Sequence, residues 1–330
     1  MLDSTFLELA TRDHHLPVLR DNVFDKTRLL AVLKKKGRVF EEWAGDNIIW
    51  SVGAKKNPTI TRFRGSSTLP SQQVNPAARP SLPSGNYSVT IGITKEERMK
   101  NRGKPEVLLK MLETQMKTGE ETLREEIGTD CYSDGSTVGG FNGVHGLRAI
   151  VDNDNTYAGI NRSTAGNEYW QANIDTTTYS DANLEDQTHA GYFPALLNDA
   201  YTDATHADAP DIVVTTKHLF NVYQIIAQAM NLRFDNATAN LGFAAVKFGP
   251  DVPVIFDDFC TTKHLFMFNT GDMSLYVVPG ANFEYDKNEQ NGSIWLQPTD
   301  QLSLVAHVIF MGQLVCDKPR QTSAYTTLGT

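Results

Sequence analysis

The sequence of 330 residues has little of what disulfide frameworks, metal sites and membrane spans require. Its three cysteines lie far apart and form no CxxC pair, so neither a zinc site nor a set of disulfides is expected. The longest apolar stretch, Leu302 to Cys316, is interrupted by polar residues and is shorter than the roughly 20 residues of a membrane-spanning helix. Asp3 and Glu8 stand where a secretory signal is basic. These absences predict a protein that folds in a reducing cytoplasm and crosses no membrane.

Composition excludes several further classes. Hydrophobic residues make up 40% and charged residues 21% of the chain, as in an ordinary globular protein rather than a disordered, collagenous or coiled-coil one. The 30 Lys and Arg residues are outnumbered by 39 Asp and Glu residues, and the net charge of −9 argues against a protein whose whole surface binds nucleic acid. A chain of this length is expected to form about two compact units.

Two long segments have a strong excess of charge of one sign. One has no acidic residue at all, and the other has very few basic residues. No Asp or Glu occurs from Asn47 to Thr94. The basic residues of that segment are Lys55, Lys56, Arg62, Arg64 and Arg79. From Asp130 to Asp211, thirteen acids face only two arginines, Arg148 and Arg162. The modest net charge therefore combines a basic segment with an acidic one.

The basic segment has the pattern of an extended arm. Residues 53–86 contain five prolines and many Ser, Gly and Thr residues, between an apolar run at 48–52 and an alternating pattern at 87–93. A loop of this length is usually functional, and its place between two strand-like runs predicts a two-stranded arm. The runs at 38–43 and 48–52, with Gly45 between them, also predict a short hairpin.

A long amphipathic helix follows the arm. Its apolar residues recur at about every fourth position and are Leu108, Leu112, Met116, Leu123 and Ile127. Pro105 before them, Gly128 after them and acid–base pairs four residues apart predict a helix over 104–127. The remaining chain alternates strands and helices, so the predicted fold class is α+β. The expected strands cover 212–214, 252–256, 265–268, 275–278 and 302–316, and the other expected helices 25–36 and 217–232.

Motifs for chemistry are nearly absent. The Gly-rich stretch 134–146 lacks the Gly-Lys-Ser/Thr of a phosphate loop and is expected to be a structural loop. A Cys131–His145 dyad would rest on nearness in the sequence alone, and His307 is expected to be a hydrogen-bonded core or edge residue. The acids of 130–211 lack EF-hand spacing, which favours a solvated or partner-facing surface over a cation site. We therefore expect no catalytic, cofactor or metal site.

The order of these elements and several short motifs resemble the major capsid proteins of tailed bacteriophages with the HK97-type fold. The motifs lie in order along roughly residues 25–320 and are Gly37–Val39, Glu120–Gly128 running into Tyr132–Gly135, Gly146–Asp152, Gly159–Ser163, Asp211–Thr216, Val252–Asp257 and Phe268–Thr270. Each motif is weak alone, and their shared order makes the resemblance specific.

The resemblance implies a division of the chain into five parts. They are an N-terminal arm at 1–37, a β-hairpin arm called the E-loop at 38–94, a peripheral (P) domain at 95–210 that holds a spine helix at 104–127, an axial (A) domain at 211–310, and a return to the P domain with a C-terminal tail at 311–330. In such proteins the E-loop lies across a neighbouring subunit.

The function implied by the resemblance is structural, not enzymatic. Copies of the chain would assemble as hexamers and pentamers into an icosahedral shell around double-stranded phage DNA. The implied partners are other copies, a portal, separate scaffolding or decoration proteins, and packaged DNA bound without sequence specificity. The implied location is the virion capsid, assembled in the cytoplasm of a bacterial host.

The opposite charges of the two segments predict how copies meet, because complementary charge fixes register and rejects wrong docking. We expect the basic residues of the E-loop to contact the spine helix or the acidic region of a neighbouring subunit. The candidate acids are Asp130, Asp134, Asp152, Asp154, Glu185 and Asp186. A solvated loop is the competing interpretation. Two other functions stay open, an encapsulin-like compartment shell and a soluble hydrolase with its site in residues 130–211.

Overall fold

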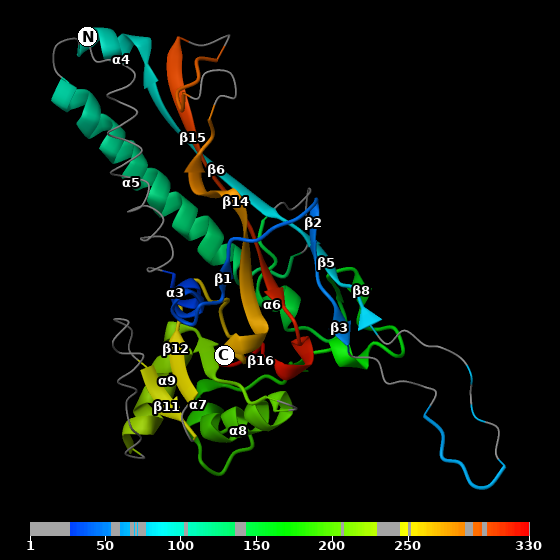
Figure 1. Cartoon of the computed structure of the whole chain (residues 1–330). Coiled ribbons are helices and arrows are strands. Elements are labelled where there is room, and N and C mark those ends of the chain that lie inside the picture. Colours follow the sequence, from blue (N-terminus) through cyan, green and yellow to red (C-terminus); the bar gives the residue numbers. More distant parts are fainter. Residues whose placement is uncertain are drawn as a thin grey trace.

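An elongated body and one projecting arm make up the computed structural model of the chain (Figure 1). The structure describes residues 27–53, 60–66, 69, 71, 77–101, 105–135, 143–205, 208–229, 245–249, 252–287, 293–298 and 302–329. Two sheets form the body, one of four strands and one of six. The N-terminal segment expected at 1–37 is described only from Thr27 onward.

The four-stranded sheet has the order β1-β14-β15-β6 and lies along the longest helix (Figure 1). Its strands are β1 (Val39–Phe40), β14 (Met273–Tyr285), β15 (Ser303–Cys316) and β6 (Gly85–Thr94). The predicted helix at 104–127 is present as α5 (Pro105–Asp130). The five residues of its predicted apolar stripe are each at most 6% exposed. The amphipathic pattern therefore turns one face of α5 towards the sheet.

A glycine lets α5 approach this sheet closely. A Cβ atom on Gly119 would lie 2.7 Å from Cγ1 of Val89 on β6. Any larger residue would push the helix away from the strand or displace the valine. The closest approach of helix and strand therefore depends on Gly119.

The six-stranded sheet has the order β11-β12-β10-β13-β16-β9. Its strands are β11 (Ala245–Phe248), β12 (Val252–Phe256), β10 (Ile212–Thr215), β13 (Leu265–Phe268), β16 (Ser323–Tyr325) and β9 (Asn173–Asp175). Helices α7 (Asp181–Glu185), α8 (Phe193–Ala204) and α9 (Lys217–Ala229) pack with Val213 of β10 in one hydrophobic cluster. Ile212 and Val214 belong to the other cluster, shared with α5, as expected from strand alternation. Both faces of β10 are therefore buried.

The chain passes between the two sheets three times, first from β6 through α5 to β9 and then twice more near its end. It leaves β13 through the short helix η2 (Thr270–Asp272) and enters β14, and it leaves β15 through η3 (Pro319–Gln321) and enters β16. Strand β14 and the start of β15, which belong to the segment expected at 211–310, lie in the sheet of β6, whereas β16 of the segment at 311–330 lies in the six-stranded sheet. Apolar alternation predicts that a strand exists but does not say which strand it pairs with.

The predicted two-stranded arm is present and lies between β1 and β6 along the chain. β2 (Asn47–Ile49) pairs antiparallel with β5 (Ser81–Pro83), and β3 (Val52–Gly53) with β4 (Ala77–Ala78). The predicted hairpin across Gly45 is wrong. β1 instead pairs parallel with β14, because the amide of Leu275 donates to the carbonyl of Arg38 at 2.9 Å and fixes the start of that pairing.

Short elements complete the body. They are α3 (Arg28–Lys35), α4 (Lys95–Lys100), α6 (Leu147–Ile150), the pair β7 (Thr156–Tyr157) and β8 (Ile160–Asn161), and η1 (Glu168–Trp170). Arg162, which follows β8, is fully buried and donates to the carbonyls of Ala149, Ile150 and Trp170. This arginine supplies donors to the carboxyl end of α6, where backbone carbonyls lack partners within the helix.

Candidate subunit interface

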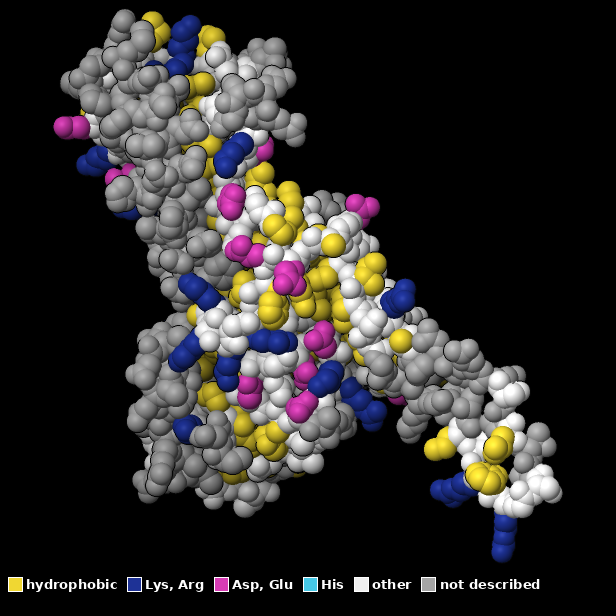
Figure 2. Space-filling model, viewed as in Figure 1, with side chains coloured by type: hydrophobic (Ala, Val, Ile, Leu, Met, Phe, Trp, Pro, Cys, Tyr) yellow, Lys and Arg dark blue, Asp and Glu magenta, His cyan; other side chains and the backbone are white. Residues whose placement is uncertain are grey.

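The basic side chains of the arm lie on its surface. Arg62, Arg64 and Arg79 are exposed, and Lys55 and Lys56 lie outside the described residues. Figure 2 shows dark blue and yellow side chains at the end of the arm, with no acidic side chain among those described there. Within the described part of the chain, neither Arg62 nor Arg79 forms a hydrogen bond or an ion pair. These charges are therefore available to another molecule.

Large apolar side chains accompany the basic ones at the end of the arm. Ile60 is 88% exposed, Phe63 64% and Leu69 55%. Exposed apolar residues gathered in one place typically mark an interaction surface. Sequence patterns indicate these residues only weakly, because each one lies between polar residues or beside a proline. The signal was the alternation from Thr59 to Arg64 within a segment without acids.

The root of the arm is fixed to the body. The ring centroids of Trp50 and Trp170 lie 6.4 Å apart, and the amide of Ser81 donates to the carbonyl of Ala158 at 3.0 Å. These contacts join both strands of the arm to the region between α6 and η1. The exposed end of the arm therefore projects from a hairpin whose base is packed against the body.

Two of the predicted acidic partners already have partners within the chain. Asp130 accepts a hydrogen bond of 2.6 Å from the hydroxyl of Tyr87, which in turn accepts the amide of Val144 at 2.8 Å. Burial raises the pKa of Asp130 above its usual value. Asp134 forms an ion pair of 3.5 Å with Arg148. Asp130 thus joins the end of α5 to β6, and Asp134 joins the segment after α5 to α6.

The next two predicted acids shape a turn. Oδ1 of Asp152 accepts the amides of Asp154 at 2.8 Å and Asn155 at 3.3 Å. The carboxylate of Asp154 accepts the hydroxyl of Ser163. Short-range bonds of this kind are typical of aspartate in turns. Asp152 and Asp154 therefore have a structural role within one chain.

The last two predicted acids lie elsewhere, at the end of α7. Asp186 accepts both the amide and the hydroxyl of Thr188, and these bonds lower the pKa of Asp186. Glu185 is exposed. Helix α7 packs on the six-stranded sheet through Leu184. The structure thus distributes the six predicted acids among three places, and their contact with a neighbouring subunit stays a prediction.

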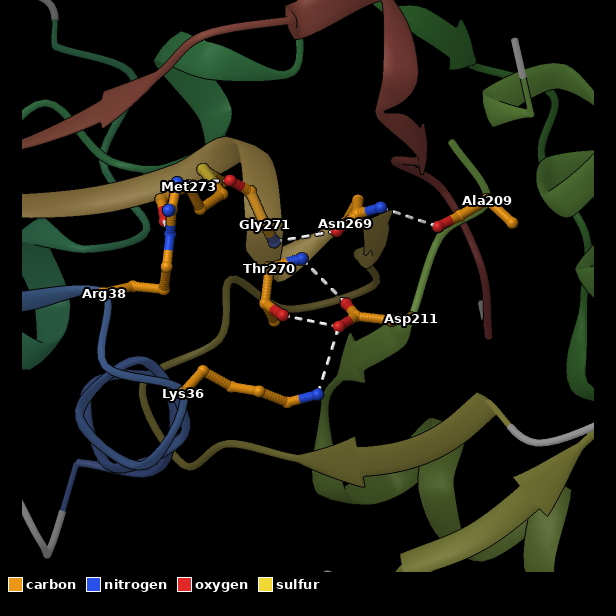
Figure 3. Close-up of polar contacts among 8 residues, drawn as sticks. All are labelled: Lys36, Arg38, Ala209, Asp211, Asn269, Thr270, Gly271 and Met273. Atoms are coloured by element: carbon orange, nitrogen blue, oxygen red, sulfur yellow. Dashed lines mark hydrogen bonds and ion pairs between the residues drawn. The ribbon is translucent and has the colours of Figure 1, made fainter. Parts of the chain in front are cut away.

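A cluster of polar contacts joins the residues before β1 to the segment that leads from β13 through η2 into β14 (Figure 3). We call residues 36–38, 209–211 and 269–273 the junction. Asp211 accepts the amide of Thr270 at 2.7 Å, its hydroxyl, and Nζ of Lys36 at 3.3 Å. Arg38 donates from Nε to the carbonyl of Met273 at 3.0 Å. The junction joins α3 to both sheets within one chain.

Solved capsid structures share this arrangement of elements. No family model and no curated protein matches the chain. The capsid of cyanophage A-1(L) matches with a TM-score of 0.59 and 14% identity, over 93% of this chain and 94% of that one. The capsid of Myoviridae phage XM1 matches with a TM-score of 0.52 and 12% identity, over 89% and 91%. The SrpI encapsulin of Synechococcus elongatus PCC 7942 gives 0.49 and 9%, over 88% and 85%. The chain has the HK97-type capsid fold.

Within the HK97-type fold of this chain, the two groups of the Cys131–His145 dyad considered for hydrolysis are buried and half-buried, respectively. Cys131 is 0% exposed, and burial raises the pKa of its thiol, so the nucleophilic thiolate is disfavoured. Burial also lowers the pKa of His145. His307 contacts the hydroxyl of Thr90 at 2.9 Å, which confirms it as a hydrogen-bonded residue. The Gly-rich loop falls mostly outside the described residues, at 136–142.

Across the described ranges, no group of three or more His, Cys, Asp or Glu side chains is placed to hold a metal ion. In that part of the chain no helix is long and apolar enough to cross a membrane. Among the described residues, the exposed apolar and basic side chains at the end of the arm form the candidate interface.

Proposed function

We propose that this chain is the major capsid protein of a tailed bacteriophage, which assembles as hexamers and pentamers into an icosahedral shell around double-stranded DNA. The observation that carries the proposal is the exposed apolar and cationic end of the arm, on a fold shared with phage capsid structures. The segment 38–94, which contains the arm, is the E-loop in this proposal, and α5 is the spine helix. Its role is structural and not enzymatic.

The physical argument starts from the exposed apolar area of the arm. Burial of apolar surface contributes roughly 25 cal/mol per Å², so Ile60, Phe63 and Leu69 would stabilise a contact with another molecule. Copies of the chain are the partner present at the highest concentration in an assembling shell. Arg62 beside these residues adds orientation, because paired charges favour one register over others.

Further parts of the proposal concern domains and partners. The N-terminal arm at 1–37, the P domain around α5 and the A domain around the six-stranded sheet follow the resemblance. A portal and separate scaffolding or decoration proteins would complete the particle, and the DNA inside would be bound without sequence specificity. Assembly would take place in the cytoplasm of the bacterial host.

Electron microscopy of the purified chain tests this function. We expect closed shells of uniform size from the natural sequence and only small species from Arg62→Glu/Arg64→Glu. The matched control Arg62→Lys/Arg64→Lys keeps the charge and should still form shells. A natural chain that stays a monomer or dimer under all assembly conditions would contradict the proposal and favour the hydrolase.

The contents of shells isolated from producing cells separate the two kinds of compartment. Nuclease-protected double-stranded DNA is expected for a phage capsid. An enclosed enzyme without DNA would instead identify an encapsulin-like shell.

A further inference from the structure

A polar cavity of about 520 Å³ lies at the β9 edge of the six-stranded sheet. Its walls come from η1, β9, β16, η3 and the carboxyl end of α8. Three carboxylates line it, those of Glu168, Asp175 and Asp203, against one basic residue, Arg320. The lining therefore carries an excess of negative charge.

The end of α8 makes the same place more negative. The carboxyl end of a helix carries a partial negative charge and favours cations. Helix α8 has no basic residue in its last turn and has Asp203 there instead. Asn173 donates to the backbone carbonyl of Asp203 at 2.7 Å, but no described residue pairs with its carboxylate. A bound cation would relieve the repulsion between the helix end and this acid.

A largely buried tyrosine at this cavity also has no hydrogen-bond partner for its hydroxyl group among the described residues. Tyr325 lines the cavity, is 5% exposed, and forms no hydrogen bond through its hydroxyl with any described residue. Buried polar groups are usually hydrogen-bonded. Burial and the nearby charge of Asp175 raise the pKa of Tyr325, so its hydroxyl stays neutral. Carboxylates and a hydroxyl together suit a guanidinium group, which offers five donors in a plane.

We propose that this cavity binds the guanidinium group of Arg62 from the arm of a second copy of the chain. Arg62 is exposed, lies on an acid-free arm, and pairs with no described residue of its own chain. Glu168 and Asp175 each accept a nearby amide, but the carboxylate of Asp203 binds no described residue. Five of the six acids expected from the sequence, in contrast, bind groups of their own chain. The proposal rests on the proposed function and names the acceptor of the arm.

Charge reversal within the cavity tests this pairing in assembling full-length protein. Asp203→Arg should raise the concentration needed for half-assembly by about tenfold, since like charges then face each other. Glu185→Arg, a reversal of an exposed acid at the end of α7 and outside the cavity lining, is the matched control and should change it by less than about twofold. Combining Asp203→Arg with Arg62→Glu should restore assembly. Equal effects of the Asp203 and Glu185 variants, or no restoration, would overturn the proposal.

A disulfide trap gives a readout that assembly alone does not. In shells of Arg62→Cys/Asp203→Cys, oxidation should produce covalent chains of several subunits, whereas each single variant should not, because the three natural cysteines are buried. Shells that form without this cross-link would overturn the pairing and leave the capsid function standing. A natural chain that forms no shells would instead contradict the proposed function.

Discussion

The arm and the junction both carry basic side chains, but they use them differently. At the junction, Lys36 and Arg38 each bind oxygen atoms of the same chain. On the arm, Arg62 and Arg79 bind no described residue, and Arg62 precedes the exposed side chain of Phe63. The same residue types therefore stabilise one subunit in the first region and are available to a second subunit in the other.

This difference predicts which property each region controls. Hydrogen bonds at the junction join groups that are partly removed from water, so their loss lowers the free energy of unfolding. Exposed charges far from partners contribute little to the stability of a single chain. Changes in the arm should therefore affect assembly, and changes at the junction should affect folding.

Removal of the arm is expected to have the largest effect. Residues 54–76 are replaced by Asn-Gly, which joins β3 to β4 through a two-residue turn suited to a hairpin. Shell formation should be lost, because the apolar and basic contacts to the neighbouring subunit are gone. The free energy of unfolding should change by less than about 1 kcal/mol, since the described residues of this segment are all exposed. Analytical ultracentrifugation and chemical denaturation measure the two quantities.

A matched control for the arm keeps its length. Residues 54–76 are replaced by a Gly-Ser segment of equal length, which removes side chains without shortening the hairpin. It should also fail to assemble. Normal shells from either variant would show that the arm is a solvated loop.

A substitution at the junction should have the opposite signature. Asp211→Ala leaves the amide and hydroxyl of Thr270 without their acceptor and releases Lys36. The free energy of unfolding should fall by about 2–3 kcal/mol, while shells still form at low temperature. Chemical denaturation and electron microscopy check both outcomes.

Lys36→Met is the control for this junction variant. Its ion pair with Asp211 is largely exposed, so the loss should be below about 1 kcal/mol. If Asp211→Ala abolished assembly without changing stability, the junction would be part of an interface between copies. The contrast between the two regions would then be wrong.

Local patterns in the sequence predicted much of the fold. The apolar stripe of α5 repeats within a few residues, and the runs that became β10, β12 and β13 are short and strongly apolar. Each of these elements buries residues that are neighbours in the sequence. Helical and strand periodicity is therefore enough to find them.

Long-range pairing explains what the sequence did not reveal. The hairpin expected around Gly45 failed because β1 pairs with β14, a strand more than 200 residues away. The candidate acids were chosen from the density of charge, but hydrogen bonds such as that of Asp130 with Tyr87 depend on the fold. The cavity at Asp203 joins η1, α8 and β16, and no local spacing indicates it.

A tyrosine on β6, the strand that follows the arm, tests whether β6 contributes to the stability of the body. Tyr87→Phe removes the donor to Asp130 and the acceptor for the amide of Val144, a fully buried residue. We expect a loss of about 2 kcal/mol in the free energy of unfolding, because a buried amide is left unpaired. Tyr169→Phe, which removes a hydroxyl with no hydrogen bond to a described residue, should cost less than about 0.5 kcal/mol. Equal losses would contradict this assignment to the body.

The smallest effect concerns Asp130, which the sequence assigned to contacts between subunits and the structure places in the body. Burial raises the pKa of Asp130, and repulsion from Glu126 raises it further, while the bond from Tyr87 opposes both. The folded chain therefore holds this proton more tightly than the unfolded chain. The stability that this proton binding contributes is fully present below the unfolded pKa of about 3.9 and is lost as the pH rises through the folded pKa.

Asp130→Asn removes this titration and keeps an oxygen that can accept the hydroxyl of Tyr87. The variant monomer should be more stable than the natural one at pH 7 by up to about 1 kcal/mol, a value reduced by partial solvent screening. The difference should vanish as the pH falls below about 4, which denaturation at several pH values measures. A natural chain that is instead more stable than the variant at pH 7, with the advantage lost in acid, would mean that a cation holds the Asp130 carboxylate. Asp130 would then be a charged partner of a basic group, as the sequence predicted, and could not be assigned to the stability of the body alone.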